Sequence, residues 1–149
     1  MISSSRAFTI VVPHGFRNDI QAYAHTDVKL EVLVAGATTS GFTVNINVVR
    51  AHIGKTTLAT VTSASIAQLK RAYGAGRFSS IQDLTVAGEP ARAVSYFATF
   101  GGANLLHDRQ VYLVRDGWAY TVTYSALSGS QYSGSMSALS ECLTSWRWR

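Results

Sequence analysis

Two segments of the sequence alternate apolar and polar residues over a full strand length, and this pattern constrains the fold more than any other feature. In residues 42–50 apolar side chains occupy the even positions up to 48, and Thr and Asn occupy the odd positions up to 47. In residues 118–125 aromatic residues and valine are even, whereas Ala, Thr and Ser are odd. Successive side chains of a strand point to opposite faces of a sheet. Each segment therefore predicts a strand with one core-facing side and one polar side.

Turn signals divide the rest of the chain into further short strands. Arg115-Asp116-Gly117 separates a strand at 110–114 from one at 118–126, and Asp-Gly is a strong hairpin signal. In residues 28–35 the alternation predicts a strand with one buried face. Other strands are predicted at 8–12, 78–84 and 91–100, with turns at 86–90 and 101–104. Strands that follow one another through short turns pair antiparallel.

Two segments have helical periodicity instead. Apolar residues recur at helical spacing in residues 56–73, and Gly74 can end that helix. A closing amphipathic helix is predicted from Tyr132, Met136, Leu139, Leu143 and Trp146. Strands, a helix, more strands and a helix indicate an α+β fold, in which an antiparallel β-sheet is flanked by helices.

The length of 149 residues predicts one domain, spanning 1–149, in which residues 1–6 form a disordered lead-in. A hydrophobic fraction of 47% is enough for a core without disulfides. The single cysteine, Cys142, falls in the closing helix, so we expect a packed thiol and not a reactive one. The apolar runs are far shorter than the ~20 residues of a membrane-spanning helix, and no signal peptide is recognisable at the start.

The chain has a net charge of +5 and a pI near 9.7, a balance that favours polyanionic partners or anionic membrane surfaces. Its arginines are spread along the sequence, so we expect a solvated basic surface more than a nucleic-acid face. Aromatic residues at strand spacing can stack bases, but they are more typical of a core. They are Tyr96, Tyr112, Trp118, Tyr120 and Tyr124. A nucleic-acid-binding module remains an alternative.

No set of residues predicts a catalytic, cofactor or metal site. Gly54-Lys55-Thr56 resembles the end of a phosphate-binding loop, but Val49 stands where that motif needs its other glycine. No serine is flanked by the glycines of a nucleophile elbow, and the four histidines are scattered. His107-Asp108-Arg109 could be read as a catalytic cluster, yet neighbours along a strand point in different directions. The interpretation that follows is a non-enzymatic protein without cofactors.

Four segments of the chain form an ordered pattern, namely 8–16 (FTIVVPHGF), 41–50 (GFTVNINVVR), 88–91 (GEPA) and 110–123 (QVYLVRDGWAYTVT). In this order and spacing they resemble the PsbP-like superfamily. The resemblance is nearest to actinobacterial LpqN-type lipoproteins, with DcrB-type proteins as relatives, and it extends from Phe8 to the closing helix. The resemblance implies an α/β/α sandwich, in which an antiparallel sheet lies between helices, in proteins that bind other proteins or hydrophobic ligands.

The leading hypothesis, which the resemblance favours, is an accessory or binding protein that acts at the cell envelope. Its partner would be a protein or a lipid-like ligand, bound by a sheet face or groove. The binding protein itself would be a monomer or a homodimer. A chaperone or adaptor for secreted effectors is the alternative. The lipoprotein signal and lipidated cysteine of the LpqN pattern are missing, which fits either an extracytoplasmic protein whose signal was removed or a cytoplasmic relative. Candidate ligand-binding residues are Asn45, Asn47, Arg50, Tyr96 and Arg109.

Overall fold

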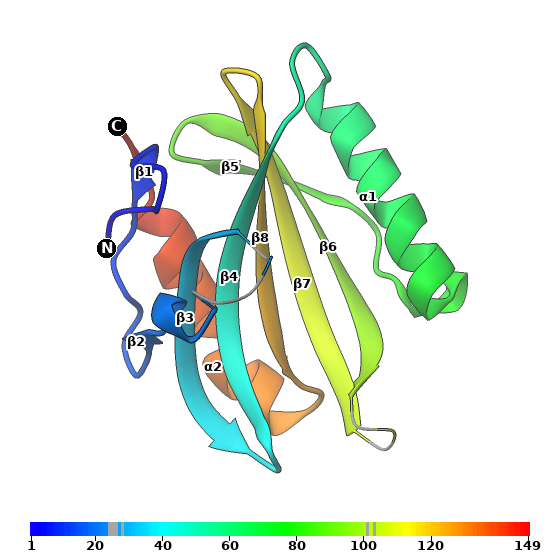
Figure 1. The fold of residues 1–149 in the computed structure, drawn as a ribbon. Coiled ribbons are helices and arrows are strands. Elements are labelled where there is room, and N and C mark those ends of the chain that lie inside the picture. Colours follow the sequence, from blue (N-terminus) through cyan, green and yellow to red (C-terminus); the bar gives the residue numbers. More distant parts are fainter. Residues whose placement is uncertain (24–26, 28, 101, 103) are drawn as a thin grey trace.

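A curved antiparallel sheet forms the centre of the protein, as shown by a computed structural model that describes residues 1–23, 27, 29–100, 102 and 104–149 (Figure 1). Within these residues the sheet has seven strands in the order β2-β3-β4-β8-β7-β6-β5, and every neighbouring pair is antiparallel. The strands are β2 (Arg17–Asn18), β3 (Leu30–Thr39), β4 (Phe42–His52), β5 (Gln82–Val86), β6 (Glu89–Phe100), β7 (Asn104–Arg115) and β8 (Trp118–Leu127). A separate two-stranded sheet pairs β1 (Phe8–Thr9) with β9 (Arg147–Trp148).

The two alternating segments are neighbours at the centre of the sheet. β4 and β8 pair directly, from Asn45 opposite Ser125 to His52 opposite Trp118. β7 and β8 form the predicted hairpin, whose turn residues Asp116 and Gly117 both have positive φ, 51° and 79°. This backbone matches the twist of the two strands and is tolerated best by Asp-Gly and Asn-Gly.

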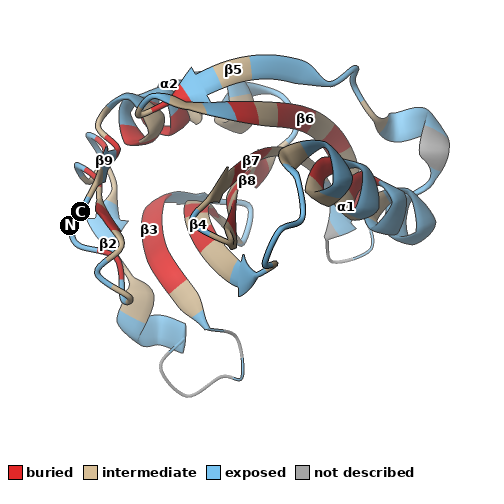
Figure 2. Ribbon diagram, turned by 90° about the horizontal axis from the view of Figure 1, so that it is seen from above, coloured by how far each residue is buried: buried red, intermediate tan, exposed pale blue. Residues whose placement is uncertain are grey.

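Two helices cover opposite faces of the sheet, as Figure 2 shows from above. Thr57 caps the N-terminus of α1 (Leu58–Tyr73), because its Oγ1 accepts a hydrogen bond from the Thr60 amide at 3.3 Å, and the helix ends before Gly74. α2 (Ser130–Thr144) buries Ala138, Leu139 and Cys142 against the main core. Short 3-10 helices, η1 (Ile20–Tyr23) and η2 (Ala75–Arg77), lie in the connections. The predicted α+β sandwich is therefore confirmed. Neither described helix is long and apolar enough to cross a membrane.

The main core lies between α2 and the sheet face that carries the even-numbered residues of β4 and β8. Val44, Ile46 and Val48 of β4 are buried there with Val122 and Tyr124 of β8. Cys142 is also fully buried, and desolvation raises the pKa of its thiol to about 12, which confirms the packed thiol. A smaller cluster on the other face joins Ile66 of α1 to the strands beneath it. The alternation along the strands thus divides their side chains between two packing layers.

Several predicted boundaries differ from those observed. β3 is buried on both faces from Glu31 to Gly36, and not on one face as expected, because η1 and residues 3–5 pack over it. Val28, the expected start of that strand, lies outside the described residues, as do Gly101 and Ala103 of the 101–104 turn. The strand predicted at 8–12 is only Phe8–Thr9, and the one at 78–84 begins at Gln82.

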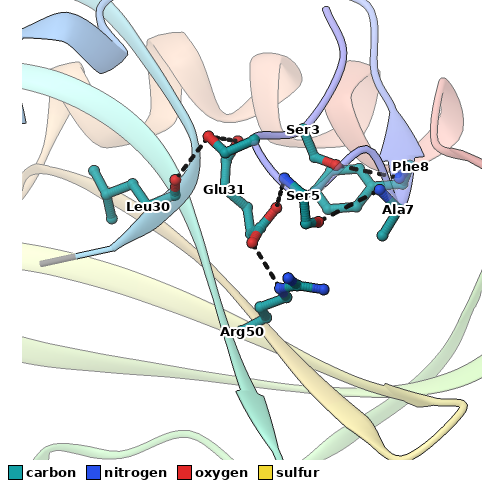
Figure 3. A network of polar contacts seen from close by, with 8 residues as sticks. Ser3, Ser5, Ala7, Phe8, Leu30, Glu31 and Arg50 are labelled. Carbon is teal, nitrogen blue, oxygen red and sulfur yellow. Dashed lines mark hydrogen bonds and ion pairs between the residues drawn. The ribbon is translucent and has the colours of Figure 1, made fainter. Parts of the chain in front are cut away.

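Residues 1–6 are not a disordered lead-in, and this expectation was wrong. The Met1 ammonium group donates to the Ile10 carbonyl oxygen at 2.7 Å, and Ser3 is buried. The Ser5 amide donates to Glu31 Oε2 at 2.8 Å, and Arg50 Nε lies 2.7 Å from Glu31 Oε1 (Figure 3). This segment, whose composition resembles that of a flexible tail, instead fits against β3, and its Ser5 backbone amide pairs with a buried carboxylate.

Candidate functional site

A row of polar side chains crosses the face of the sheet that carries α1. Asn45 of β4 lies opposite Ser125 of β8, Ser125 lies opposite Asp108 of β7, and Asp108 lies opposite Tyr96 of β6. Directly opposed residues of neighbouring strands point to the same face of a sheet. The register therefore places two of the predicted site residues, Asn45 and Tyr96, at the two ends of one row.

A second row runs beside the first. It consists of Asn47, Thr123 and Gln110 on β4, β8 and β7. The two rows are bonded to each other, because Asn47 Nδ2 donates to Asn45 Oδ1 at 3.4 Å and Gln110 Nε2 donates to the Tyr96 hydroxyl at 3.3 Å. We call the half-buried residues Asn45, Asn47, Thr121, Thr123 and Ser125 the polar face.

Helix α1 covers only the β6 and β7 side of this layer. Ile66 packs on Val94 and Tyr112, with Leu58 and Phe78 at the edge of the contact. Next to the helix, between α1 and the β4–β8 pair, lies a cavity of about 340 Å³ lined by residues that include Val61 and Thr121. The polar face thus remains open beside α1.

Asp108 lies in the part of the first row that is on the α1 side, between Ser125 and Tyr96. The residue is 7% exposed, and its Oδ1 has no hydrogen-bond partner among the described residues. Desolvation raises the pKa of the carboxyl from 3.8 to about 6, although hydrogen bonds from Ser125 and Tyr96 oppose the rise. Burial, followed by the negative charge of Asp108, raises the pKa of the Tyr96 phenol, which stays protonated and able to donate.

The two predicted arginines lie on the opposite face, apart from the asparagines. Arg50 is paired with Glu31, and its guanidinium lies 4.2 Å from the centre of the Trp118 ring. Arg109 contacts Gln82 and Ser95 instead. The five candidates therefore do not form one surface: Asn45, Asn47 and Tyr96 lie together, whereas Arg50 and Arg109 lie behind them.

The chemistry available on the polar face is hydrogen bonding by neutral amides and hydroxyls. Among the described residues, no group of three or more His, Cys, Asp or Glu side chains could hold a metal ion. Asp108 is on one face of β7, and its neighbours His107 and Arg109 are on the other, as the register requires. The aromatic residues expected in the core are buried, except for the half-buried Trp118.

Comparisons with known proteins identify the fold. Neither protein-family models nor curated protein sequences match the chain. Among solved structures, LpqN of Mycobacterium tuberculosis, described as involved in cell envelope biogenesis, has a TM-score of 0.72 at 15% identity, over 93% of this chain and 81% of LpqN. The cyanobacterial PsbP of Synechocystis has a TM-score of 0.67 at 15% identity, over 100% of this chain and 91% of that one. The chain has the PsbP-like fold.

The Ran-binding protein Mog1p of Saccharomyces cerevisiae is also similar, with a TM-score of 0.59 at 12% identity, over 99% of this chain and 93% of Mog1p. The likeness to the PsbP-like superfamily and to LpqN expected from the sequence is confirmed as a likeness of fold. The relation to DcrB-type proteins stays a prediction.

Sequence reasoning on this PsbP-like chain missed part of its polar layer. Thr123 and Ser125 were recognised as the polar side of their strand but not as neighbours of Asn45 and Asn47. Asp108 and Gln110 were not selected either. A signal was available, because Asp108, Gln110 and Tyr112 are all at even positions and therefore lie on one face of their strand. The partner strands had to be known before that face could be located in the sheet.

Proposed function

We propose that this chain is a non-enzymatic binding protein that receives a partner protein on its polar face. The observation that carries the proposal is the partial cover by α1, which packs on β6 and β7 and leaves the polar residues of β4 and β8 half-exposed. In an antiparallel sheet one face commonly packs on the core, and the other is polar and accessible to solvent. Here neutral donors and acceptors are held in two ordered rows by the strand register.

The composition of the polar face favours a protein partner. Asn45 and Asn47 each carry both a donor and an acceptor, and the hydroxyls of Thr121, Thr123 and Ser125 can serve as either. Such groups can bond to the backbone and the polar side chains of another protein. The adjoining buried carboxyl of Asp108 adds support, since groups with strongly displaced pKa values gather at functional sites.

An association with the cell envelope is part of the same proposal. LpqN is described as involved in cell envelope biogenesis, and Mog1p is described as Ran-binding. The first description supports the location and the second supports a protein as partner, in both cases by likeness of fold. A chaperone or adaptor for secreted proteins would use the same face and differs only in the partner's identity.

Site-specific photo-crosslinking in the source cells tests the proposal. A photoreactive amino acid would replace Asn47 in one variant and Thr123 in another, and Gln68, exposed on α1, in a control. We expect the same protein to be crosslinked from Asn47 and Thr123 and not from Gln68. Mass spectrometry would then identify that protein.

A competing substitution makes the test specific. Ser125→Arg places a large cation at the Asn45 end of the polar face and should reduce crosslinking from Asn47 at least tenfold. Ser80→Arg, at an exposed position before β5, should leave it unchanged. Equal crosslinking from Asn47 and Gln68, or turnover of a substrate that is lost with one polar side chain, would contradict the proposal.

A further inference from the structure

An apolar groove lies between α2 and the β5–β7 side of the sheet, on the face opposite the polar face. Its cavity of about 460 Å³ falls within the ~300–1,000 Å³ range of small-molecule sites. Leu84 of β5 lines one side, and Met136, Leu139 and Leu143 of α2 line the other. We call it the Arg109 groove, because Arg109 of β7 also lines it.

The apolar wall on α2 is a continuous stripe that the described chain leaves partly uncovered. Met136, Leu139 and Leu143 are spaced by three and four residues, so they lie on one side of the helix. Leu139 belongs to the buried core, whereas Met136 and Leu143 are half-buried and pack against its edge. Leu84 is also half-buried on the facing strand. An extended hydrocarbon chain could lie between these side chains, and the flexible Met136 can adjust to its shape.

The charge of Arg109 is not compensated within the part of the chain that the structure describes. Its guanidinium donates to Gln82 Oε1 at 2.6 Å and to Ser95 Oγ at 3.3 Å, which are both neutral. The other half-buried arginines each have a carboxylate oxygen close to the guanidinium. These are Arg50 with Glu31 at 2.7 Å, Arg92 with Asp83 at 3.2 Å and Arg115 with Glu89 at 2.9 Å. Among the half-buried arginines of the described residues, Arg109 is therefore the one without a carboxylate beside it.

The side chains that share a face of β7 with Arg109 include no carboxylate. His107 lies two residues away on the same face of β7, with its ring stacked on Tyr132 at 3.5 Å and on Phe97 at 4.3 Å between centroids. Desolvation, and secondly the charge of Arg109, lowers the pKa of His107. The described residues that line the groove include no acidic side chain. An anion would therefore meet one uncompensated guanidinium and no repelling carboxylate.

We propose that the Arg109 groove binds a long-chain carboxylate, with the carboxylate on the Arg109 guanidinium and the hydrocarbon chain between Leu84 and the α2 stripe. A guanidinium fits a carboxylate in a bidentate geometry, and the apolar walls fit a single alkyl chain. The site is on the other side of the sheet from the polar face. It therefore goes beyond the proposed protein binding, and either can be wrong without the other.

Calorimetric titration of the purified protein with three dodecyl compounds, each below its solubility limit and any micelle concentration, tests the head group. Dodecanoate carries the carboxylate, dodecanol has the same chain without charge, and dodecyltrimethylammonium reverses the charge. We expect dodecanoate to bind at least tenfold more tightly than either of the others. Decanoate should bind about fifteenfold more weakly than dodecanoate, since each buried methylene contributes about 0.8 kcal/mol, or about fourfold in affinity.

Two pairs of matched variants test the location. Arg109→Gln should weaken dodecanoate at least tenfold and leave dodecanol unchanged, whereas Arg92→Gln, a half-buried arginine paired on the opposite face, should change both less than twofold. Ser140→Trp fills the groove from an exposed position of α2 without altering Arg109, and should abolish binding. Ser137→Trp, which is exposed on the same helix but lines a different cavity, should not.

Three results would overturn the proposal. One is no dodecanoate binding up to its solubility limit, and the second is equal affinity for dodecanoate and dodecyltrimethylammonium. The third is a Ser140→Trp variant that binds as the unmodified protein does. If Arg109→Gln fails to fold, as judged by circular dichroism, the Ser140 and Ser137 pair decides, because both positions are exposed.

Discussion

Replacing Asp108 by asparagine should make the protein more stable at neutral pH. The carboxyl is buried, and one of its oxygens has no partner among the described residues. Its pKa is raised from 3.8 to about 6, so the folded state favours the protonated form. At about 1.4 kcal/mol for each pKa unit, keeping Asp108 ionised in the folded protein costs about 3 kcal/mol at pH 7. An asparagine side chain at this position would have nearly the same shape without the charge.

The sign of the pH dependence follows from the direction of this shift. Between pH 3.8 and about 6 the folded protein binds more protons at Asp108 than the unfolded chain does, so the contribution of Asp108 to stability falls as the pH rises through this window. The cost is nearly complete at pH 7 and only about 1 kcal/mol at pH 4.5. The advantage of Asp108→Asn should therefore shrink from at most about 3 to about 1 kcal/mol on acidification.

Urea unfolding followed by tryptophan fluorescence at pH 7 and pH 4.5 measures both differences. Asp83→Asn is the control, because the Asp83 side chain is 83% exposed and paired with Arg92 at the surface. Its effect at pH 7 should stay below about 1 kcal/mol. The reasoning is refuted if Asp108→Asn is less stable than the unmodified protein at pH 7, or if the difference is the same at both pH values.

Three further predictions concern a buried thiol, close packing at glycines and a buried ion pair. The buried Cys142 thiol, with a pKa of about 12, should react with a disulfide reagent only after denaturation, which absorbance would follow. Gly36→Ala should lower the free energy of unfolding in urea by about 1–3 kcal/mol, because the new Cβ would lie 2.8 Å from Val44 Cγ1. Gly134→Ala in α2 has open space around the new Cβ and should raise the free energy of unfolding by about 0.5–1 kcal/mol. Glu31→Gln should cost about 1–3 kcal/mol and speed hydrogen exchange in residues 3–6, since the amide and guanidinium partners lose their anion.

The fold could be predicted largely from local patterns. The alternation in 42–50 and 118–126 and the Asp116-Gly117 turn are properties of neighbouring residues, and the structure confirms the strands and the hairpin. The burial of β3 on both faces could not be predicted from its own sequence. It depends on which distant segments cover the strand, and residues 3–5 resemble a flexible tail until Glu31 supplies a partner.

The candidate site was predicted less well, although part of the error could have been avoided. Asn45 and Asn47 are at odd positions of their strand and Arg50 is at an even one, so the period of two already places them on opposite faces. The position of Arg109 relative to Tyr96 required the pairing of β6 with β7. The burial of Asp108 required the position of α1 as well. The local sequence predicts which residues of a strand share a face, whereas strand pairing and helix placement depend on the whole chain.

The pairing of β1 with β9 has a consequence for biosynthesis. Phe8 stacks on Trp146 with 3.8 Å between ring centroids, and the Val11 amide donates to Ser145 Oγ, 134 positions later. The first strand can bridge locally to Ile2, but its β9 partner is missing until residues 147–148 have left the ribosome. Contacts of such long sequence separation form late, because the intervening chain must be closed into a loop. Co-translational folding of this chain thus remains incomplete until residues 145–148 emerge.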